Sequence, residues 1–258
     1  MCQLLGMSAN VPTDICFSFD GFRKRGGLTD KHADGWGIAF FEGRGVRVFL
    51  DPCAASHSPI AELVRTYPIK SSNVVAHIRR ATQGAVALEN CHPFQREMWG
   101  RPWVFAHNGD LPGFRHQGND GFQPVGTTDS EAAFCTILNH LHRSFPGAMP
   151  GIAELHRVLA QITHELNAVG PLNYLLSNGQ FLIAHCSTQL HYVVRQSPFR
   201  KAHLIDGDVT VDFQRLTQPT DRVAIIATLP LTDDEVWLPL PTGSLVVFAD
   251  GMPLTLPD

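Results

Sequence analysis

Apolar runs of strand length open and close this chain, and two segments with helical periodicity lie between them. The predicted strands before the helices are 3–7, 34–41, 46–50, 74–78 and 103–106, of which 34–41 and 46–50 are apolar runs with β-branched or aromatic residues. The predicted strands after the helices are 172–176, 180–185, 223–227 and 245–248. Apolar residues at helical spacing predict helices over 132–141 and 152–166, and Ser58-Pro59 predicts the start of another helix. This order predicts an α+β fold with two antiparallel sheets and helices packed outside them. No Pro/Gly/Ser-rich linker divides the chain, so we expect a single domain over residues 1–258.

Composition narrows the class of protein. Hydrophobic residues make up 44% of the 258 residues and charged residues 17%, which is typical of a globular chain. A net charge of -4 without a run of Lys and Arg argues against a nucleic-acid partner. We find no signal peptide and no stretch that could span a membrane, so we expect a soluble cytoplasmic protein.

The six cysteines are scattered and form no C-x-x-C pair, which argues against a disulfide framework. Most of these thiols are expected to be buried and inert. The 13 histidines show no convincing metal-ligand spacing, so we predict no metal site and no cofactor.

Cys2 is the first candidate for catalysis. Removal of Met1 would place its thiol beside a free α-amine, whose pKa of roughly 7.7 to 8.0 lets it accept a proton near neutral pH. One residue would then carry both nucleophile and base, and if Met1 stayed attached that amine would be missing. From its position alone, Cys2 could equally be a small structural residue.

The segment from His77 to Gly84 leaves an apolar strand and carries Arg79 and Thr82. An arginine at a strand end suits bidentate capture of a carboxylate, and the Thr82 hydroxyl adds a hydrogen-bonding group. The alternative is a solvated basic turn.

Another apolar strand runs directly into His107-Asn108-Gly109. The Asn108 amide and the Gly109 N–H could together stabilise an oxyanion. Asn-Gly is also a strong hairpin signal, although the Asp110-Leu111-Pro112-Gly113 sequence that follows does not alternate like a returning strand.

Thr128 or Asp129 is predicted to cap the helix that follows. A carboxylate at that position could also bind the α-ammonium group of an amino acid.

In this order the motifs resemble the class II glutamine amidotransferases. The motifs on which this resemblance rests are Met1-Cys2, H-x-R-x-A-T-x-G at residues 77–84, His92-Pro93-Phe94, His107-Asn108-Gly109 and Thr128-Asp129-Ser130-Glu131. Asp34-Gly35-Trp36-Gly37, the segment 173–176 and the tail resemble the single-domain YafJ-like branch less specifically. The resemblance implies the four-layer αββα N-terminal-nucleophile (Ntn) hydrolase fold, with two stacked antiparallel sheets between helix layers.

The resemblance also implies hydrolysis of glutamine to glutamate and ammonia through a γ-glutamyl thioester, without a cofactor. Cys2 then corresponds to the nucleophile and its α-amine to the base. Asn108 and Gly109 correspond to the oxyanion hole. The substrate-binding residues would be Arg79 for the α-carboxylate with Thr82 nearby, His107, and Asp129 for the α-ammonium. An ammonia-accepting partner enzyme would fit this chemistry.

Two departures concern the loop that closes over glutamine. Arg80 stands where the sugar-phosphate synthase branch has Trp, and Gln83 stands where it has His. Two other functions stay open: an amidohydrolase that releases glutamate from γ-glutamyl conjugates, as in ergothioneine synthesis, and a non-catalytic module that senses glutamine. The sequence does not decide the oligomeric state.

Overall fold

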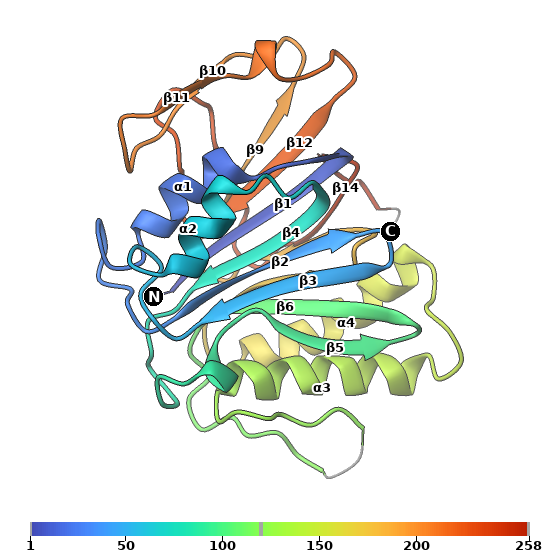
Figure 1. Ribbon diagram of the computed structural model, residues 1–258. Helices are drawn as coiled ribbons and strands as arrows, with labels where there is room; N and C mark the ends of the chain where they lie inside the picture. Colours follow the sequence, from blue (N-terminus) through green and yellow to red (C-terminus); the bar gives the residue numbers. More distant parts are fainter. Residues whose placement is uncertain (1, 119–120, 257–258) are drawn as a thin grey trace.

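Two antiparallel β-sheets lie face to face in the computed structural model, which describes residues 2–118 and 121–256 (Figure 1). The first sheet has the order β13 (Leu238–Pro239), β9 (His191–Gln196), β12 (Arg222–Ala227), β1 (Gln3–Thr13), β4 (Ser71–Ile78), β2 (Trp36–Glu42) and β3 (Gly45–Asp51). The second has the order β15 (Met252–Pro253), β14 (Leu245–Ala249), β8 (Leu182–His185), β7 (Leu172–Ser177), β6 (Arg101–Gly109) and β5 (Phe94–Met98). A separate hairpin of β10 (Lys201–His203) and β11 (Thr210–Asp212) projects beside β9 and β12.

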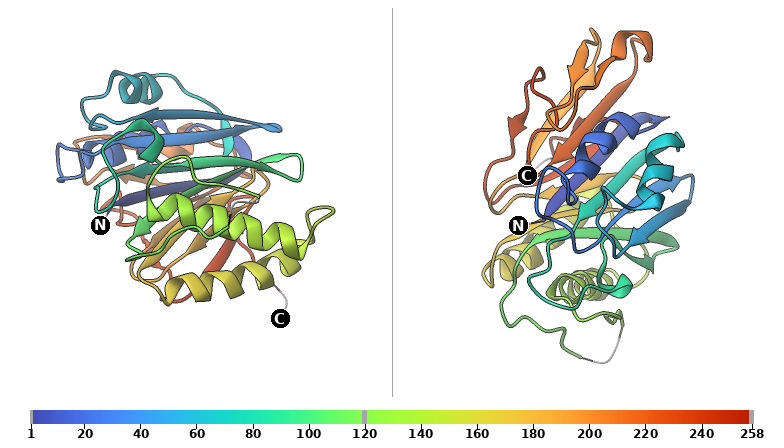
Figure 2. Two further views of the ribbon diagram at one scale, coloured as in Figure 1. Left: turned by 90° about the horizontal axis from the view of Figure 1, so that it is seen from below. Right: turned by 60° about the vertical axis from the view of Figure 1, so that its left-hand side comes forward.

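Helices cover the outer face of each sheet (Figure 2). The first sheet carries α1 (Cys16–Lys24) and α2 (Pro59–Thr66), and the second carries α3 (Asp129–Ser144) and α4 (Ile152–Asn167). The short 3-10 helices are η1 (Leu88–Asn90) and η2 (Phe213–Arg215). The predicted αββα layering is confirmed. None of the helices in the described residues is long and apolar enough to cross a membrane.

Strand alternation divides the core into three layers. On β1, Leu5 and Met7 face α1 and α2, whereas Leu4 faces the second sheet. Gly6 also faces that sheet, and a Cβ atom there would lie 2.8 Å from Leu182 Cδ2. Gly6 therefore lets the sheets approach closely near the start of β1.

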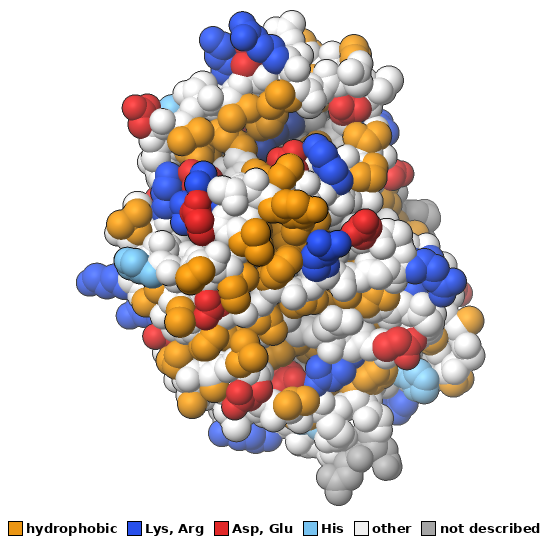
Figure 3. Space-filling model, in the orientation of Figure 1, with side chains coloured by type: hydrophobic (Ala, Val, Ile, Leu, Met, Phe, Trp, Pro, Cys, Tyr) orange, Lys and Arg blue, Asp and Glu red, His pale blue; other side chains and the backbone are white. Residues whose placement is uncertain are grey.

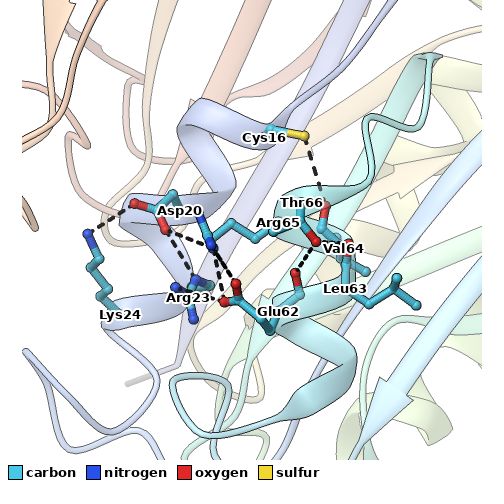
Figure 4. Close-up of polar contacts among 9 residues, drawn as sticks. All are labelled: Cys16, Asp20, Arg23, Lys24, Glu62, Leu63, Val64, Arg65 and Thr66. Atoms are coloured by element: carbon cyan, nitrogen blue, oxygen red, sulfur yellow. Dashed lines mark hydrogen bonds and ion pairs between the residues drawn. The ribbon is translucent and has the colours of Figure 1, made fainter.

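Charged side chains join α1 to α2 on the surface (Figure 4). Asp20 accepts contacts from Arg23 and Lys24 on its own helix, at 3.2 and 3.0 Å. Arg23 also reaches Glu62 on α2 at 3.3 Å, and Glu62 pairs with Arg65. Single ion pairs near the surface stabilise a protein by only about 0–1 kcal/mol, so the apolar face beneath them supplies most of the packing free energy.

Every strand and helix predicted from the sequence is present. Some observed elements are longer than predicted, and others were not predicted at all. The strand predicted over 3–7 continues to Thr13 as β1, and α1, β5 and the β9–β11 region were not predicted. Ser58 caps α2 and Thr128 caps α3 through side-chain oxygens, as expected. The expectation of mostly buried cysteines holds for Cys91, Cys135 and Cys186, whereas Cys53 is exposed.

Candidate active site

The ends of three strands bring Cys2, Arg79 and Gly109 together. Cys2 precedes β1, and Gln3 pairs with Ile78 at the end of β4, so Cys2 lies opposite the residues that follow β4. The Arg80 N–H donates to Cys2 Sγ at 3.2 Å, and the thiol lies 3.4 Å from the Arg80 carbonyl oxygen. Gly109 ends β6 in the facing sheet.

A small pocket of about 20 Å³ opens at this meeting point. Its walls contain six of the seven predicted site residues, which are Cys2, Arg79, Thr82, His107, Gly109 and Asp129. The remaining wall residues are Arg80, Gln83, His92, Thr128 and Ser130. Segments up to 128 positions apart in the sequence, from Cys2 to Ser130, therefore meet at one pocket.

Asn108, the seventh predicted residue, lies behind the pocket wall. Its side chain is buried, and its Nδ2 lies 3.4 Å from Thr228 Oγ1. The same hydroxyl accepts the Leu4 N–H at 2.9 Å, so the Asn108 amide is held beside the start of β1. Asn108 pairs with Asn173 on β7 rather than with a returning neighbour, which excludes the hairpin alternative.

Gly109 occupies a position with no room for a side chain. A Cβ atom there would overlap the Pro171 carbonyl oxygen and would lie 2.5 Å from His107 Nε2. The backbone of Gly109 can line the pocket because the residue has no Cβ atom.

Arg79 is buried, and its guanidinium group holds the loop that follows it. Nη2 donates to the carbonyl oxygens of Gln83 and Gly84 at 2.8 and 3.2 Å, and Nη1 donates to those of Ala85 and Asp34 at 3.0 and 3.4 Å. The alternative of a solvated turn is therefore wrong for Arg79. The same four contacts compete with any carboxylate for the two Nη groups.

Asp129 opens α3 and is held by backbone donors. Its Oδ2 accepts the Leu111 N–H at 2.7 Å, and its Oδ1 accepts the Ser130 N–H at 2.9 Å. A carboxylate offers about four lone-pair sites, so Asp129 retains capacity for a further donor such as an ammonium group.

His107 links α3 to the segment before β7. Its Nδ1 lies 2.8 Å from Ser130 Oγ, and its Nε2 lies 3.2 Å from the Pro171 carbonyl oxygen. A carbonyl only accepts, so Nε2 carries the proton and Nδ1 accepts from the Ser130 hydroxyl. Both ring nitrogens are engaged, which favours a positioning role for His107 over direct contact with a substrate.

Burial raises the pKa of the Cys2 thiol, and the hydrogen bond from the Arg80 N–H opposes that rise. The neutral thiol is therefore favoured in the free protein, and attack requires a base that removes its proton. The predicted removal of Met1, which would free the α-amine for that role, concerns a residue outside the described part of the chain.

The imidazole rings of two further histidines contact each other at a tilted angle beside the site. The ring centroids of His77 and His92 are 4.1 Å apart, and both residues are buried. Burial, reinforced by the neighbouring charges of His107 and Arg79, lowers the pKa of both imidazoles well below the usual 6.5, and His77 adds to the lowering at His92. Both rings are therefore neutral at physiological pH.

We expect this pair to make the fold sensitive to acid. Below about pH 6.5 these two histidines bind protons in the unfolded chain but not in the folded protein. The free energy of unfolding therefore has its full value above that pH and falls as the pH decreases. From about pH 6.5 to pH 5 each histidine should lower the free energy of unfolding by up to about 2 kcal/mol. Urea titrations at several pH values measure this slope, which should be smaller in His92→Gln. An equal slope in the variant would contradict the assignment.

A larger cavity lies elsewhere. It has a volume of about 450 Å³ and lies between α1, the far end of β1 and the segment that carries β11 and η2. Figure 3 shows apolar side chains on both sides of a hollow in this region. No residue predicted to act in catalysis or to bind the substrate lines this cavity, so cavity size and the sequence motifs indicate different places.

Sequence reasoning did not predict several hydrogen bonds around the pocket. Asp34 Oδ2 accepts the Ala81 N–H at 2.8 Å, and Gln83 Nε2 donates to Asp110 Oδ1 at 2.6 Å. The Asp34 segment was recognisable only as a weak resemblance. Nothing in the sequence indicated that Gln83 and Asp110, which are 27 positions apart, meet at the pocket.

A model of the class-II glutamine amidotransferases matches residues 1–257, so the chain belongs to this family. It is 52% identical over 251 residues to the Escherichia coli protein named "Putative glutamine amidotransferase YafJ", covering 97% of this chain and 98% of that protein. It is 54% identical over 251 residues to a Haemophilus influenzae protein named "Putative glutamine amidotransferase", covering 97% and 85%.

Solved structures agree with the fold. The structure of a predicted glutamine amidotransferase from Pseudomonas aeruginosa superposes with a TM-score of 0.79 at 45% identity, covering 98% of this chain and all of that one. Glutamine phosphoribosylpyrophosphate amidotransferase from Bacillus subtilis matches with a TM-score of 0.59 at 14% identity, covering 98% of this chain and 48% of that one. The second match supports the Ntn fold alone.

Proposed function

We propose that this protein hydrolyses the side-chain amide of glutamine, or of a γ-glutamyl relative, with Cys2 as the nucleophile. The sulfur attacks the γ-carbonyl carbon, the C–N bond breaks, and the thiol proton leaves with the amine. Water then cleaves the γ-glutamyl thioester, which releases glutamate and restores the thiol. Ammonia from glutamine could pass to an acceptor enzyme or to solvent.

One observation carries this proposal: Cys2 and Gly109 share a pocket with Arg79 and Asp129. The first two supply a nucleophile and a backbone donor for a tetrahedral oxyanion. The other two supply opposite charges that suit the α-carboxylate and α-ammonium of a free amino acid. Asn108, one residue from the wall, is the second candidate oxyanion donor.

Binding of glutamine requires the loop over residues 82–87 to move, whereas the backbone of Arg80 stays bonded to Cys2 and that of Ala81 to Asp34. A pocket of about 20 Å³ holds roughly one water molecule, far less than an amino acid. The loop is held by the Arg79 contacts and by the Gln83–Asp110 hydrogen bond. An incoming α-carboxylate can replace the loop carbonyl groups at Arg79, because a charge-assisted pair is the stronger of the two.

The direct test is an assay of the purified protein without added cofactor. Glutamate and ammonia should appear from glutamine in equal amounts, and γ-glutamyl conjugates should be tested in parallel. Glutamine binding without any product from either substrate class would support the glutamine-sensing alternative instead.

A further inference from the structure

Arg79 and Arg80, the two residues that follow β4, differ in burial and in hydrogen bonding. Arg79 is buried and donates to backbone carbonyl groups, whereas Arg80 is exposed. Among the residues that the structure describes, no side chain forms an ion pair or a hydrogen bond with the Arg80 guanidinium group. Arg80 is thus a cation in the pocket wall whose donors are free for a ligand.

The backbone fixes Arg80 next to the reacting atom. Its backbone nitrogen lies 3.2 Å from Cys2 Sγ, so the Arg80 side chain branches from the Cα atom next to a group in contact with the nucleophile. Under the proposed function, Arg79 and Asp129 hold the glutamyl half of the substrate inside the pocket. The leaving amine lies at the opposite end of the substrate from the groups that Arg79 and Asp129 hold, and Arg80 is the exposed arginine of the pocket wall.

The carboxylates around the pocket have other hydrogen-bond partners than Arg80. Asp34 accepts from the Ala81 N–H, Asp110 from Gln83, and Asp129 from the backbone of α3. None of these carboxylates forms an ion pair with Arg80 in the described residues, so the guanidinium group is available to an anionic ligand. A carboxylate is the anion that guanidinium geometry matches in a bidentate manner.

We propose that Arg80 selects γ-glutamyl substrates whose leaving amine carries a carboxylate, such as γ-glutamyl dipeptides, over glutamine. This inference rests on the proposed function and narrows its substrate class. The reaction steps are those given above, except that the amine that leaves with the thiol proton is an amino acid instead of ammonia. Arg80 would contact this amino acid during binding and in the transition state, which raises kcat/KM.

Three substrates test the inference: γ-glutamylglycine, γ-glutamylglycinamide and glutamine. The first two have nearly equal size and differ in the leaving-group charge. Wild-type protein should prefer γ-glutamylglycine over its amide by about tenfold in kcat/KM, and added salt should reduce this ratio because Arg80 is exposed. In Arg80→Gln the ratio should fall to about one, and Arg80→Lys should retain part of it.

Arg157→Gln is the matched control, because Arg157 is exposed on α4 and does not line the pocket. It should keep the wild-type ratio. Equal kcat/KM for the two conjugates in wild type, or an unchanged ratio in Arg80→Gln, would overturn the role of Arg80 and leave the proposed function intact. No turnover of any of the three substrates would contradict the proposed function itself.

Discussion

Replacing Cys2 with alanine should lower glutamine turnover by at least about 10⁴-fold, because the variant lacks the atom that forms the thioester. Glutamine binding should change little, since Arg79 and Asp129 supply the charge contacts with the amino-acid end. Steady-state kinetics measure the first quantity. A ligand-induced shift of the unfolding midpoint measures the second.

Cys53→Ala is the control for this experiment. Cys53 is exposed and lies outside the pocket, so its replacement should leave turnover unchanged. If Cys2→Ala kept more than a small fraction of wild-type turnover while folded, another nucleophile or an activated water would have to replace Cys2 in the proposal.

Asn108→Ala should produce the second-largest loss, about 10²- to 10³-fold in kcat. The amide near Thr228 Oγ1 would donate to the oxyanion only once the tetrahedral adduct forms. Its loss should therefore lower kcat much more than it raises KM.

Asn10→Ala removes an amide at the far end of β1, where Nδ2 donates to the Thr220 carbonyl oxygen at 2.9 Å. This control variant should keep wild-type kcat. A large rise in KM with unchanged kcat for Asn108→Ala would move Asn108 from transition-state stabilisation to substrate binding.

Periodicity predicted the strand and helix order because most core strands and both long helices bury a regular apolar face. The strand predicted from periodicity ended at Met7, whereas β1 continues to Thr13, because the continuation contains the polar residues Ser8 and Asn10 and then Pro12. Periodicity missed α1, whose phenylalanines at 17, 19 and 22 are mixed with charges and a glycine over only nine residues. Local patterns this short do not distinguish a helix from a loop.

Motifs indicated the candidate site residues, but not their partners. The Asn-Gly pair after an apolar strand fits both a hairpin and a strand end, and only the pairing of β6 with β7, more than 60 positions later, separates the two. Likewise, Arg79 was expected to face a carboxylate. Its contacts with the carbonyl oxygens of its own loop depend on how residues 80–87 fold back. Such long-range and loop contacts leave no periodic signal in the sequence.

Covalent trapping tests the thioester chemistry most directly. Diazo-oxo-norleucine, an electrophilic glutamine analogue, should label one cysteine per chain, and peptide mass spectrometry should find the label on Cys2, with glutamine slowing the reaction. Modification of the exposed Cys53 or of any other cysteine, with Cys2 unmodified in an active protein, would contradict the assignment of Cys2 as the nucleophile.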